Sequence, residues 1–275
     1  MNTLQALDRP EARTDPFPAA TPESIPTRPR LLSHVGRWGR ARRWLPDDAT
    51  RVLDVGCAFG YGSAAVVASG PAGRVIVGVE HDPQLLEQAG RLFPWLPVID
   101  ADVGELPIPD SCADAVLLLD VIEHVAEPQH AIAEAARVLR PGGALVVSVP
   151  HRGLTSGLDS VNAYTALRRR RPSLPALDGM VATEGGEHHH FTVAELRGLL
   201  EPQFSIDRLA RTGLGLQELV NLAMLALLAR DAPRASRALA PLHLLVYLLD
   251  DLVPTGAFGY HLAVRARSNK PGARA

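Results

Sequence analysis

The sequence predicts an α/β fold in which helices cover both faces of a doubly wound, mostly parallel sheet. Short apolar segments that read as buried strands alternate with helical segments from residue 51 to residue 149. A parallel sheet covered on both faces is built from this alternation. The chain has 275 residues, of which 47% are hydrophobic and 21% charged. That is enough to form a buried core without disulfides or metals.

In the first half of the chain, each expected strand is a short apolar run followed by a turn or helix signal. These strands are expected at residues 51–55, 74–79, 98–99, 113–119 and 144–149. A basic amphipathic helix is expected at 31–45, a helix of small residues up to residue 68, and further helices at 83–92 and 128–139. Pro83 suits the first turn of its helix, and the sequence Pro141-Gly142-Gly143 is expected to end the last one.

The pattern changes after residue 150. Residues 151–187 contain several prolines and are expected to form a loop. A helix is expected at 192–200, where Thr192 and Glu195 have the spacing of a capping box. Residues 204–209 and 258–267 alternate as strands do, and two apolar helices are expected between them, at 214–229 and 234–252.

Composition excludes several classes of protein. With 28 Lys and Arg against 30 Asp and Glu, the net charge is -2, so no overall field favours nucleic acid or anionic lipid as a partner. The two cysteines, Cys57 and Cys112, form neither a disulfide framework nor a cysteine-type zinc site. The first residues contain acids rather than an apolar leader, and no apolar run reaches the roughly 18–20 residues of a membrane span. A cytoplasmic protein is therefore expected.

The segment VLDVGCAFGYG, at residues 52–62, carries the most information about function. A buried strand ends on Asp54, and a glycine-rich turn leads into a helix. Glycines let the backbone approach a ligand closely, and a helix N-terminus offers unpaired N–H groups. The G-x-G-x-x-G dinucleotide fingerprint does not fit, because Ala58 and Tyr61 replace its second and third glycines. Asp54 would repel a pyrophosphate and favours a ligand with a positive charge.

Two further acids follow the next two strands. Glu80 lies about 20 residues beyond the glycine turn, an offset at which a carboxylate accepts hydrogen bonds from a ribose diol. Asp102 follows the third strand, where a carboxylate can accept from an adenine amino group. The expected ligand therefore has a ribose, an adenine and a cationic centre, but no phosphate.

These segments together resemble the class I S-adenosylmethionine-dependent methyltransferases, in particular the small-molecule branch near the ubiquinone and menaquinone methyltransferases. The resemblance covers roughly residues 45–211 and depends on the segments VLDVGCAFGYG, GVEHD, DADVGELPIPDSCADAVLLLDVIEHV and ARVLRPGGALVVSVP. It implies a Rossmann-like, seven-stranded sheet with an antiparallel last strand, and S-adenosylmethionine as cofactor. The family's usual glycine is replaced by Ala58, which narrows the approach to the backbone slightly.

The resemblance also implies roles for individual residues. Asp54, Gly56 and Gly60 would hold the methionine moiety, and Glu80 would hold the ribose hydroxyls. Asp102 and Val103 would bind adenine, and Asp120 would face the methionine amino group. Cys57 and His81 border these positions and complete the expected cofactor-binding set.

Histidines are the candidates for a general base on the acceptor side. His124 and His151 follow the fourth and fifth strands, where the cofactor and acceptor sites of the family meet. Either could remove a proton from a hydroxyl acceptor, although His124 could instead pack under the sheet edge and His151 could lie in a solvated loop. The run His188-His189-His190 lacks the spacing of a metal site, so no metal is expected. One of these three histidines could face the substrate.

Two features outside the motifs have alternative interpretations. Arg168–Arg171 could form a solvated loop or bind an anion or a membrane surface. The helices at 214–252 are an insertion relative to the family, whose last two strands are usually joined by a short turn. They could pack on the body, form a homodimer contact, cover a hydrophobic substrate or touch a membrane.

The sequence thus predicts a flexible proline-rich tail at 1–30 and a methyltransferase domain at 31–275. The domain comprises a cofactor-binding core (46–150), an acceptor-site loop (151–190) and a helical insertion (213–255). The expected function is methyl transfer from S-adenosylmethionine to an O, N or C atom of a small, hydrophobic molecule. The alternatives are a non-catalytic cofactor-binding scaffold that assembles through its apolar insertion, and an NAD-type oxidoreductase, which the broken glycine fingerprint disfavours.

Overall fold

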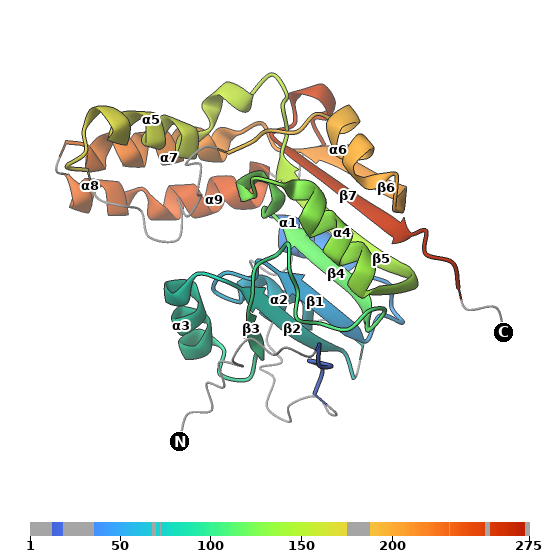
Figure 1. The fold of residues 1–275 in the computed structure, drawn as a ribbon. Helices are drawn as coiled ribbons and strands as arrows, with labels where there is room; N and C mark the ends of the chain where they lie inside the picture. The colour runs from blue at the N-terminus through green and yellow to red at the C-terminus, as the bar shows by residue number, and fades with distance from the viewer. Residues whose placement is uncertain are drawn as a thin grey trace.

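A computed structural model describes residues 13–18, 36–67, 70–71, 73–174, 188–230, 232–250 and 254–272. The strands form one sheet of seven, in the order β3-β2-β1-β4-β5-β7-β6 (Figure 1). The last strand in the chain, β7, is antiparallel to both its neighbours, and the other pairs are parallel. The predicted fold class is confirmed. The strands are β1 (Arg51–Val55), β2 (Val75–Glu80), β3 (Val98–Asp100), β4 (Ala113–Leu119), β5 (Leu139–Pro150), β6 (Phe204–Thr212) and β7 (His261–Ser268).

The central strands are mostly apolar because both faces of the sheet are covered, although β1 contains Asp54 and β4 contains Asp114. Along β4, Val116 and Leu118 join one buried cluster, while Leu117 and Leu119 join the other. Side chains alternate between faces along a strand, so a strand buried on both faces favours apolar residues at most positions. This is why the boundaries of β1 and β4 agree with the sequence prediction.

Helices cover the two faces in separate layers. α1 and α2 contribute to the cluster on one face, and α4 and α6 contribute to the cluster on the other. The capping box predicted for α6 is present. The helices are α1 (Gly36–Trp44), α2 (Tyr61–Val67), α3 (Pro83–Leu92), α4 (Pro128–Val138), α5 (Ser160–Arg170), α6 (Val193–Leu200), α7 (Leu216–Leu228), α8 (Pro233–Ala238) and α9 (Ala240–Asp250).

The structure corrects the sequence prediction at three places. Residues 151–187 were expected to be a loop, but α5 begins at Ser160, where the Asp159 carboxylate accepts from the N–H of Asn162. The helix expected at 234–252 is two helices, because Pro241 lacks the N–H that would continue α8 into α9. Leu139 belongs to β5 rather than to α4, and it pairs with Ala113 ahead of an irregularity in the strand pairing.

Most of the predicted tail at 1–30 lies outside the described residues. Its described part, residues 13–18, contacts the body of the protein. Asp15 forms an ion pair with Arg51, whose guanidinium lies 4.5 Å from the centre of the Phe17 ring. Among the described helices, none has the length and the apolar character needed to cross a membrane.

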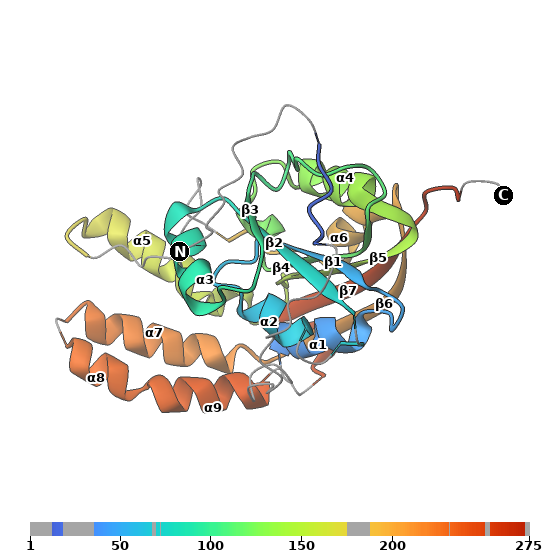
Figure 2. The ribbon, with the colours of Figure 1, turned by 90° about the horizontal axis from the view of Figure 1, so that it is seen from below.

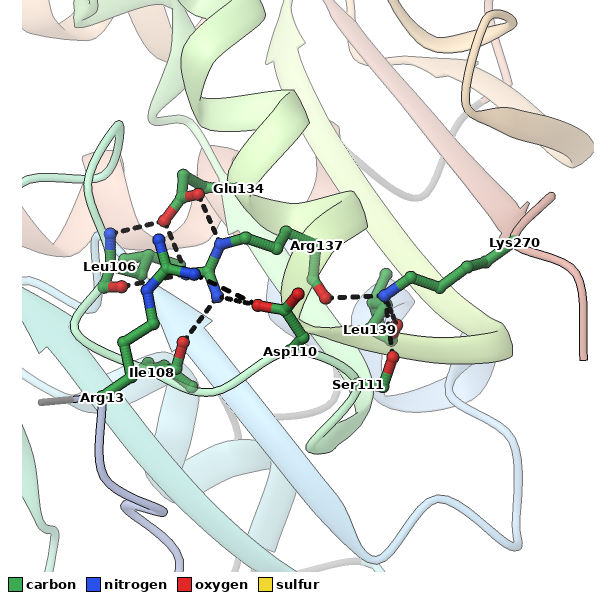
Figure 3. Close-up of polar contacts among 9 residues, drawn as sticks. All are labelled: Arg13, Leu106, Ile108, Asp110, Ser111, Glu134, Arg137, Leu139 and Lys270. Carbon is green, nitrogen blue, oxygen red and sulfur yellow. Dashed lines mark hydrogen bonds and ion pairs between the residues drawn. The ribbon is translucent and has the colours of Figure 1, made fainter. Parts of the chain in front are cut away.

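Arg137 on α4 joins the loop before β4 to the body (Figure 3). Its guanidinium donates to Glu134, to Asp110 and to the carbonyl oxygens of Leu106 and Ile108, at distances of 2.6–2.9 Å. Only 16% of the Arg137 side chain is exposed, so little water would replace these bonds if the guanidinium were removed.

We expect Arg137→Met to lower the free energy of unfolding by about 2–4 kcal/mol. The substitution leaves the half-buried Glu134 carboxylate and the carbonyl groups of Leu106 and Ile108 without the hydrogen bonds that Arg137 donates. The matched control is Arg91→Met, which removes an ion pair with Glu87 on the exposed face of α3 and should cost about 0.5 kcal/mol or less. Urea unfolding measures both. Equal losses in the two variants would show that the Arg137 cluster contributes no more than a surface pair.

Candidate functional site

The predicted site residues gather at the carboxyl edge of the sheet. Asp54 lies within β1 just before the glycine turn, Glu80 ends β2, and Asp120 directly follows β4. The parallel registers of these strands place their ends side by side. Ligands of open α/β sheets bind at this edge.

The turn after β1 leaves no room for a side chain at two positions, Gly56 and Gly60. Gly56 has a φ of 74°, and a Cβ added to it would lie 2.5 Å from a methyl group of Val121. Gly60 has a φ of 79°, and its Cβ would lie 2.8 Å from Leu96. The N–H of Gly56 donates to the Val79 carbonyl oxygen, which fixes the turn against β2. The result is a backbone cradle that only glycine can form at these two positions.

Ala58, in the same turn, has a φ of 46°, a left-handed conformation that costs an L-residue roughly 1–2 kcal/mol. We expect Ala58→Gly to raise the free energy of unfolding by about 0.5–1 kcal/mol, after allowing for the greater entropy of glycine in the unfolded chain.

The matched control for Ala58→Gly is Ala64→Gly in α2, where φ is not positive and glycine should lower stability by about 0.5–1 kcal/mol. Thermal unfolding of the two variants gives the sign of each change. A loss of stability in both variants would contradict the argument from backbone strain.

Glu80 is oriented by backbone N–H groups of the glycine turn and of the residues directly after β2. Its Oε2 accepts from the N–H of Ala58 at 2.9 Å, and its Oε1 accepts from the N–H groups of His81 and Asp82. The carboxylate therefore ties the glycine turn to the end of β2. The side chain of His81 is exposed, with its Nδ1 3.5 Å from Asp100.

Asp54 is buried beneath the cradle, where the Ser63 hydroxyl donates to its Oδ2 at 2.6 Å. Burial raises the pKa of Asp54 to about 6, helped by the charge of Glu80 and opposed by the Ser63 hydrogen bond. Cys57 is also buried, and burial raises the pKa of its thiol well above the usual value. Cys57 therefore stays a thiol at neutral pH.

Asp120 combines a strained backbone with a strong ionic contact. Its φ is 57°, its Oδ1 accepts from the Ser148 hydroxyl at 2.6 Å, and its Oδ2 lies 2.6 Å from the guanidinium of Arg37. Burial would raise the pKa of Asp120, but Arg37 and the other neighbouring groups outweigh this effect and lower it. A non-glycine residue held at positive φ is typical of a functional position.

Asp102 and Val103 lie apart from these contacts. Asp102 is exposed and accepts from the N–H of Gly104 at 2.7 Å within its own loop. Val103 packs partly against the core. Within the described residues, no hydrogen bond joins Asp102 to Asp54 or Glu80, so its role in binding adenine remains a prediction.

Asp159, which directly precedes α5, is the centre of a histidine cluster. Its Oδ2 lies 3.0 Å from His188 Nδ1 and 2.8 Å from His190 Nε2, and it accepts from the Tyr260 hydroxyl at 3.1 Å. Although burial raises the pKa of Asp159, these hydrogen bonds lower it overall to well below the usual range. A carboxylate only accepts hydrogen bonds, so both histidine nitrogens must donate.

His124 joins this cluster through its ring, whose centre lies 4.6 Å from that of His188. Burial, together with the nearby His188, lowers the pKa of His124 to about 4, so the ring is neutral at neutral pH. The preceding residue, Glu123, is buried with neither carboxyl oxygen bonded in the part of the chain described. Burial raises the pKa of Glu123 well above its usual value.

The side chain of the other predicted base, His151, is bonded to a backbone carbonyl group rather than to Asp159. It is buried, and its Nδ1 lies 2.8 Å from the Gly259 carbonyl oxygen. Its backbone also pairs with Phe191, ahead of α6. Across the described ranges, no group of His, Cys, Asp and Glu side chains is arranged to hold a metal ion.

Sequence reasoning missed Arg37, Asp159 and Tyr260. Arg37 belongs to a helix predicted only as basic, and nothing in the sequence indicated its contact with Asp120, 83 residues away in numbering. Asp159 lay in a segment expected to be a loop. The one available signal was its place three residues before Asn162, which is typical of a helix cap.

Comparison with known proteins agrees with this geometry. Residues 53–147 match the family model described as a methyltransferase domain. A probable S-adenosylmethionine-dependent methyltransferase of Mycobacterium tuberculosis is 36% identical over 104 residues, which are 38% of this chain and 37% of that protein. The demethylmenaquinone methyltransferase of Tropheryma whipplei is 29% identical over 164 residues, 58% of this chain and 62% of that protein.

A third relative is the 27-O-demethylrifamycin SV methyltransferase of Amycolatopsis mediterranei, 35% identical over 103 residues, which are 35% of this chain and 37% of that protein. Each of these matches spans less than two thirds of the relative's length. The S-adenosylmethionine-dependent methyltransferase from Thermotoga maritima has the same fold, with a TM-score of 0.55 at 16% identity, covering 84% of this chain and 86% of that one. Residues 53–147 are therefore a methyltransferase domain of the class I S-adenosylmethionine-dependent family, as the sequence resemblance predicted.

Proposed function

We propose that the chain transfers a methyl group from S-adenosylmethionine to a hydroxyl group of a small, hydrophobic molecule. The observation that carries this proposal is the glycine cradle held between two carboxylates, Asp54 and Glu80. A cradle flanked by carboxylates disfavours the phosphates of a dinucleotide and suits a cationic adenosyl ligand. The residues at this edge of the sheet therefore fit the cofactor of the family.

Asp120 and Arg37 suit the amino-acid end of that cofactor. Their side chains carry opposite charges and lie in direct contact at the end of β4. The ammonium group of a bound methionine moiety would donate hydrogen bonds to the Asp120 carboxylate, and the methionine carboxylate would pair with Arg37. Glu80, oriented by three N–H groups, would accept from the ribose hydroxyls.

Bound S-adenosylmethionine supplies a methyl group that its sulfonium already activates, so the protein's part is alignment and exclusion of water. On the acceptor side, His188 would take the proton of the hydroxyl group. Asp159 holds the Nδ1–H of His188 and so leaves the basic lone pair on Nε2. Among the described residues, Nε2 of His188 has no hydrogen-bond partner. His124, neutral and packed against His188, would keep that ring in place.

The relatives support a small, hydrophobic acceptor. Two of them are named for a demethylmenaquinone and for a demethylated rifamycin, and the second name specifies an oxygen. Asp159, His188 and His124 support the choice of a hydroxyl, because a group with an acidic proton needs a base where a tertiary amine would not.

The test is transfer of radiolabelled methyl from S-adenosylmethionine by the full chain to hydroquinones, other phenols, amines and aliphatic alcohols of matched size. We expect the hydroxyl compounds to be methylated and the amines to be methylated much more slowly. Preference for amines would contradict the assignment of the acceptor atom. Binding of S-adenosylmethionine without transfer to any of these classes would contradict the proposed reaction and favour a non-catalytic scaffold.

A further inference from the structure

Helices α5, α7, α8 and α9 form an arm that extends away from the sheet, as two perpendicular views agree (Figures 1 and 2). Buried acids hold the arm together at its root. Glu218 on α7 accepts from the N–H and hydroxyl of Ser160 at the start of α5. Asp250, at the end of α9, accepts from the N–H groups of residues 214–216 at 2.7–3.1 Å. The arm is therefore an ordered part of the fold.

The arm exposes large apolar side chains in helical stripes. On α9, Leu242, Leu245 and Leu249 are 47%, 52% and 55% exposed, and their spacing places them on one face of the helix. On α7, Leu216 and Leu219 are 44% and 47% exposed. Several large apolar side chains exposed on two helices of one arm favour an interaction site over isolated surface leucines.

The charge of the arm differs from that of the whole chain. Residues 160–171 and 214–250 contain seven arginines but only three acids, although the net charge of the chain is -2. Two of these acids, Glu218 and Asp250, are buried at the root, and the third, Asp231, lies outside the described residues. The exposed arginines Arg170, Arg171, Arg230, Arg234 and Arg237 come at the C-terminal end of α5 and around α8, which lie at the outer end of the arm in both views.

We propose that the arm docks the protein on the surface of an anionic lipid bilayer. Exposed leucines along two helices suit insertion at the level of the headgroups, and arginines at the outer end suit the negative charge of the leaflet. A second copy of the arm fits less well, because pairing would bring arginines of like charge together. The docking proposal does not depend on the reaction that the chain catalyses.

The test is co-sedimentation of the full chain with vesicles of phosphatidylcholine alone or with 40% phosphatidylglycerol. We expect at least tenfold tighter binding to the anionic vesicles and at least a tenfold loss between 50 and 500 mM salt. The double variant L245D/L249D should bind the anionic vesicles at least tenfold more weakly. R234Q/R237Q should bind the anionic vesicles more weakly, but its binding to phosphatidylcholine alone should not change. The matched control is Leu92→Asp on α3, outside the arm, where the side chain is 46% exposed and binding should not change.

Circular dichroism verifies that each variant is folded before its binding is measured. Failure of the wild-type chain to bind anionic vesicles at 50 mM salt would overturn the proposal, as would binding that L245D/L249D leaves intact. Sedimentation equilibrium without lipid tests whether a second copy of the chain covers this surface. If the wild-type chain forms a dimer, L245D/L249D dissociates it and no binding to vesicles is seen, the arm is a subunit interface instead.

Discussion

Replacing Asp120 with asparagine is expected to weaken the binding of S-adenosylmethionine by roughly 10- to 100-fold. Asparagine tolerates the positive φ of this position and retains an acceptor for the Ser148 hydroxyl. It removes the negative charge that the methionine ammonium group requires, and a hydrogen bond between charged groups contributes about 1.5–3 kcal/mol. Calorimetric titration of the wild type and the variant measures the change.

The same titration with 5′-methylthioadenosine separates this effect from general damage to the site. That compound lacks the amino-acid end, so Asp120→Asn should bind it as the wild type does. Glu87→Gln, which removes an exposed carboxylate on α3, should bind both compounds normally. Equal losses for the two compounds in Asp120→Asn would mean that Asp120 supports the fold of the site rather than the ammonium group.

Replacing His188 with glutamine is expected to lower kcat by about 10²–10³, the usual contribution of a general base, with whichever hydroxyl acceptor is methylated fastest. Glutamine can still donate a hydrogen bond to Asp159, but it has no basic lone pair to take a proton. Binding of S-adenosylhomocysteine should not change, because the proposal places His188 against the acceptor and not against the cofactor. Steady-state kinetics and calorimetry measure the two properties separately.

The neighbouring residue provides the control. His189 is exposed, and its ring packs on Phe191 rather than in the Asp159 cluster. His189→Gln should therefore retain the wild-type kcat. If both variants are fully active, the base lies elsewhere, and His124 or His151 becomes the next candidate. If both lose activity equally, the loss comes from the segment before α6 and not from proton transfer.

The cofactor half of the fold was predictable because its signals are local. Mostly apolar runs predicted β1 and β4, and the proline at the start of α3 predicted that helix. The end of β5 was also predictable, but its beginning was not. Pro141 and Gly142 look like a stop signal, whereas in the structure they lie within a strand that starts at Leu139, where its pairing with β4 is irregular.

The region after β5 was harder to predict because contacts between residues distant in sequence determine its structure. Helix α5 contains Asn162, Tyr164 and three consecutive arginines, a fourth arginine directly follows it, and its helical pattern is weak. Glu218, 58 residues later, fixes its first turn, and Asp159 caps it while holding two histidines. The sequence indicated that one of His188–His190 could face the substrate, but only the position of Asp159 distinguishes His188 from His189.

Calorimetric titration of the full chain with S-adenosylhomocysteine, compared with NAD, tests the central claim most directly. The carboxylates around the glycine cradle should admit the phosphate-free adenosyl ligand and reject the pyrophosphate. We predict one molecule of S-adenosylhomocysteine bound per chain and no measurable heat with NAD. Saturable binding of NAD, or a folded chain that gives no heat with S-adenosylhomocysteine, would contradict the account.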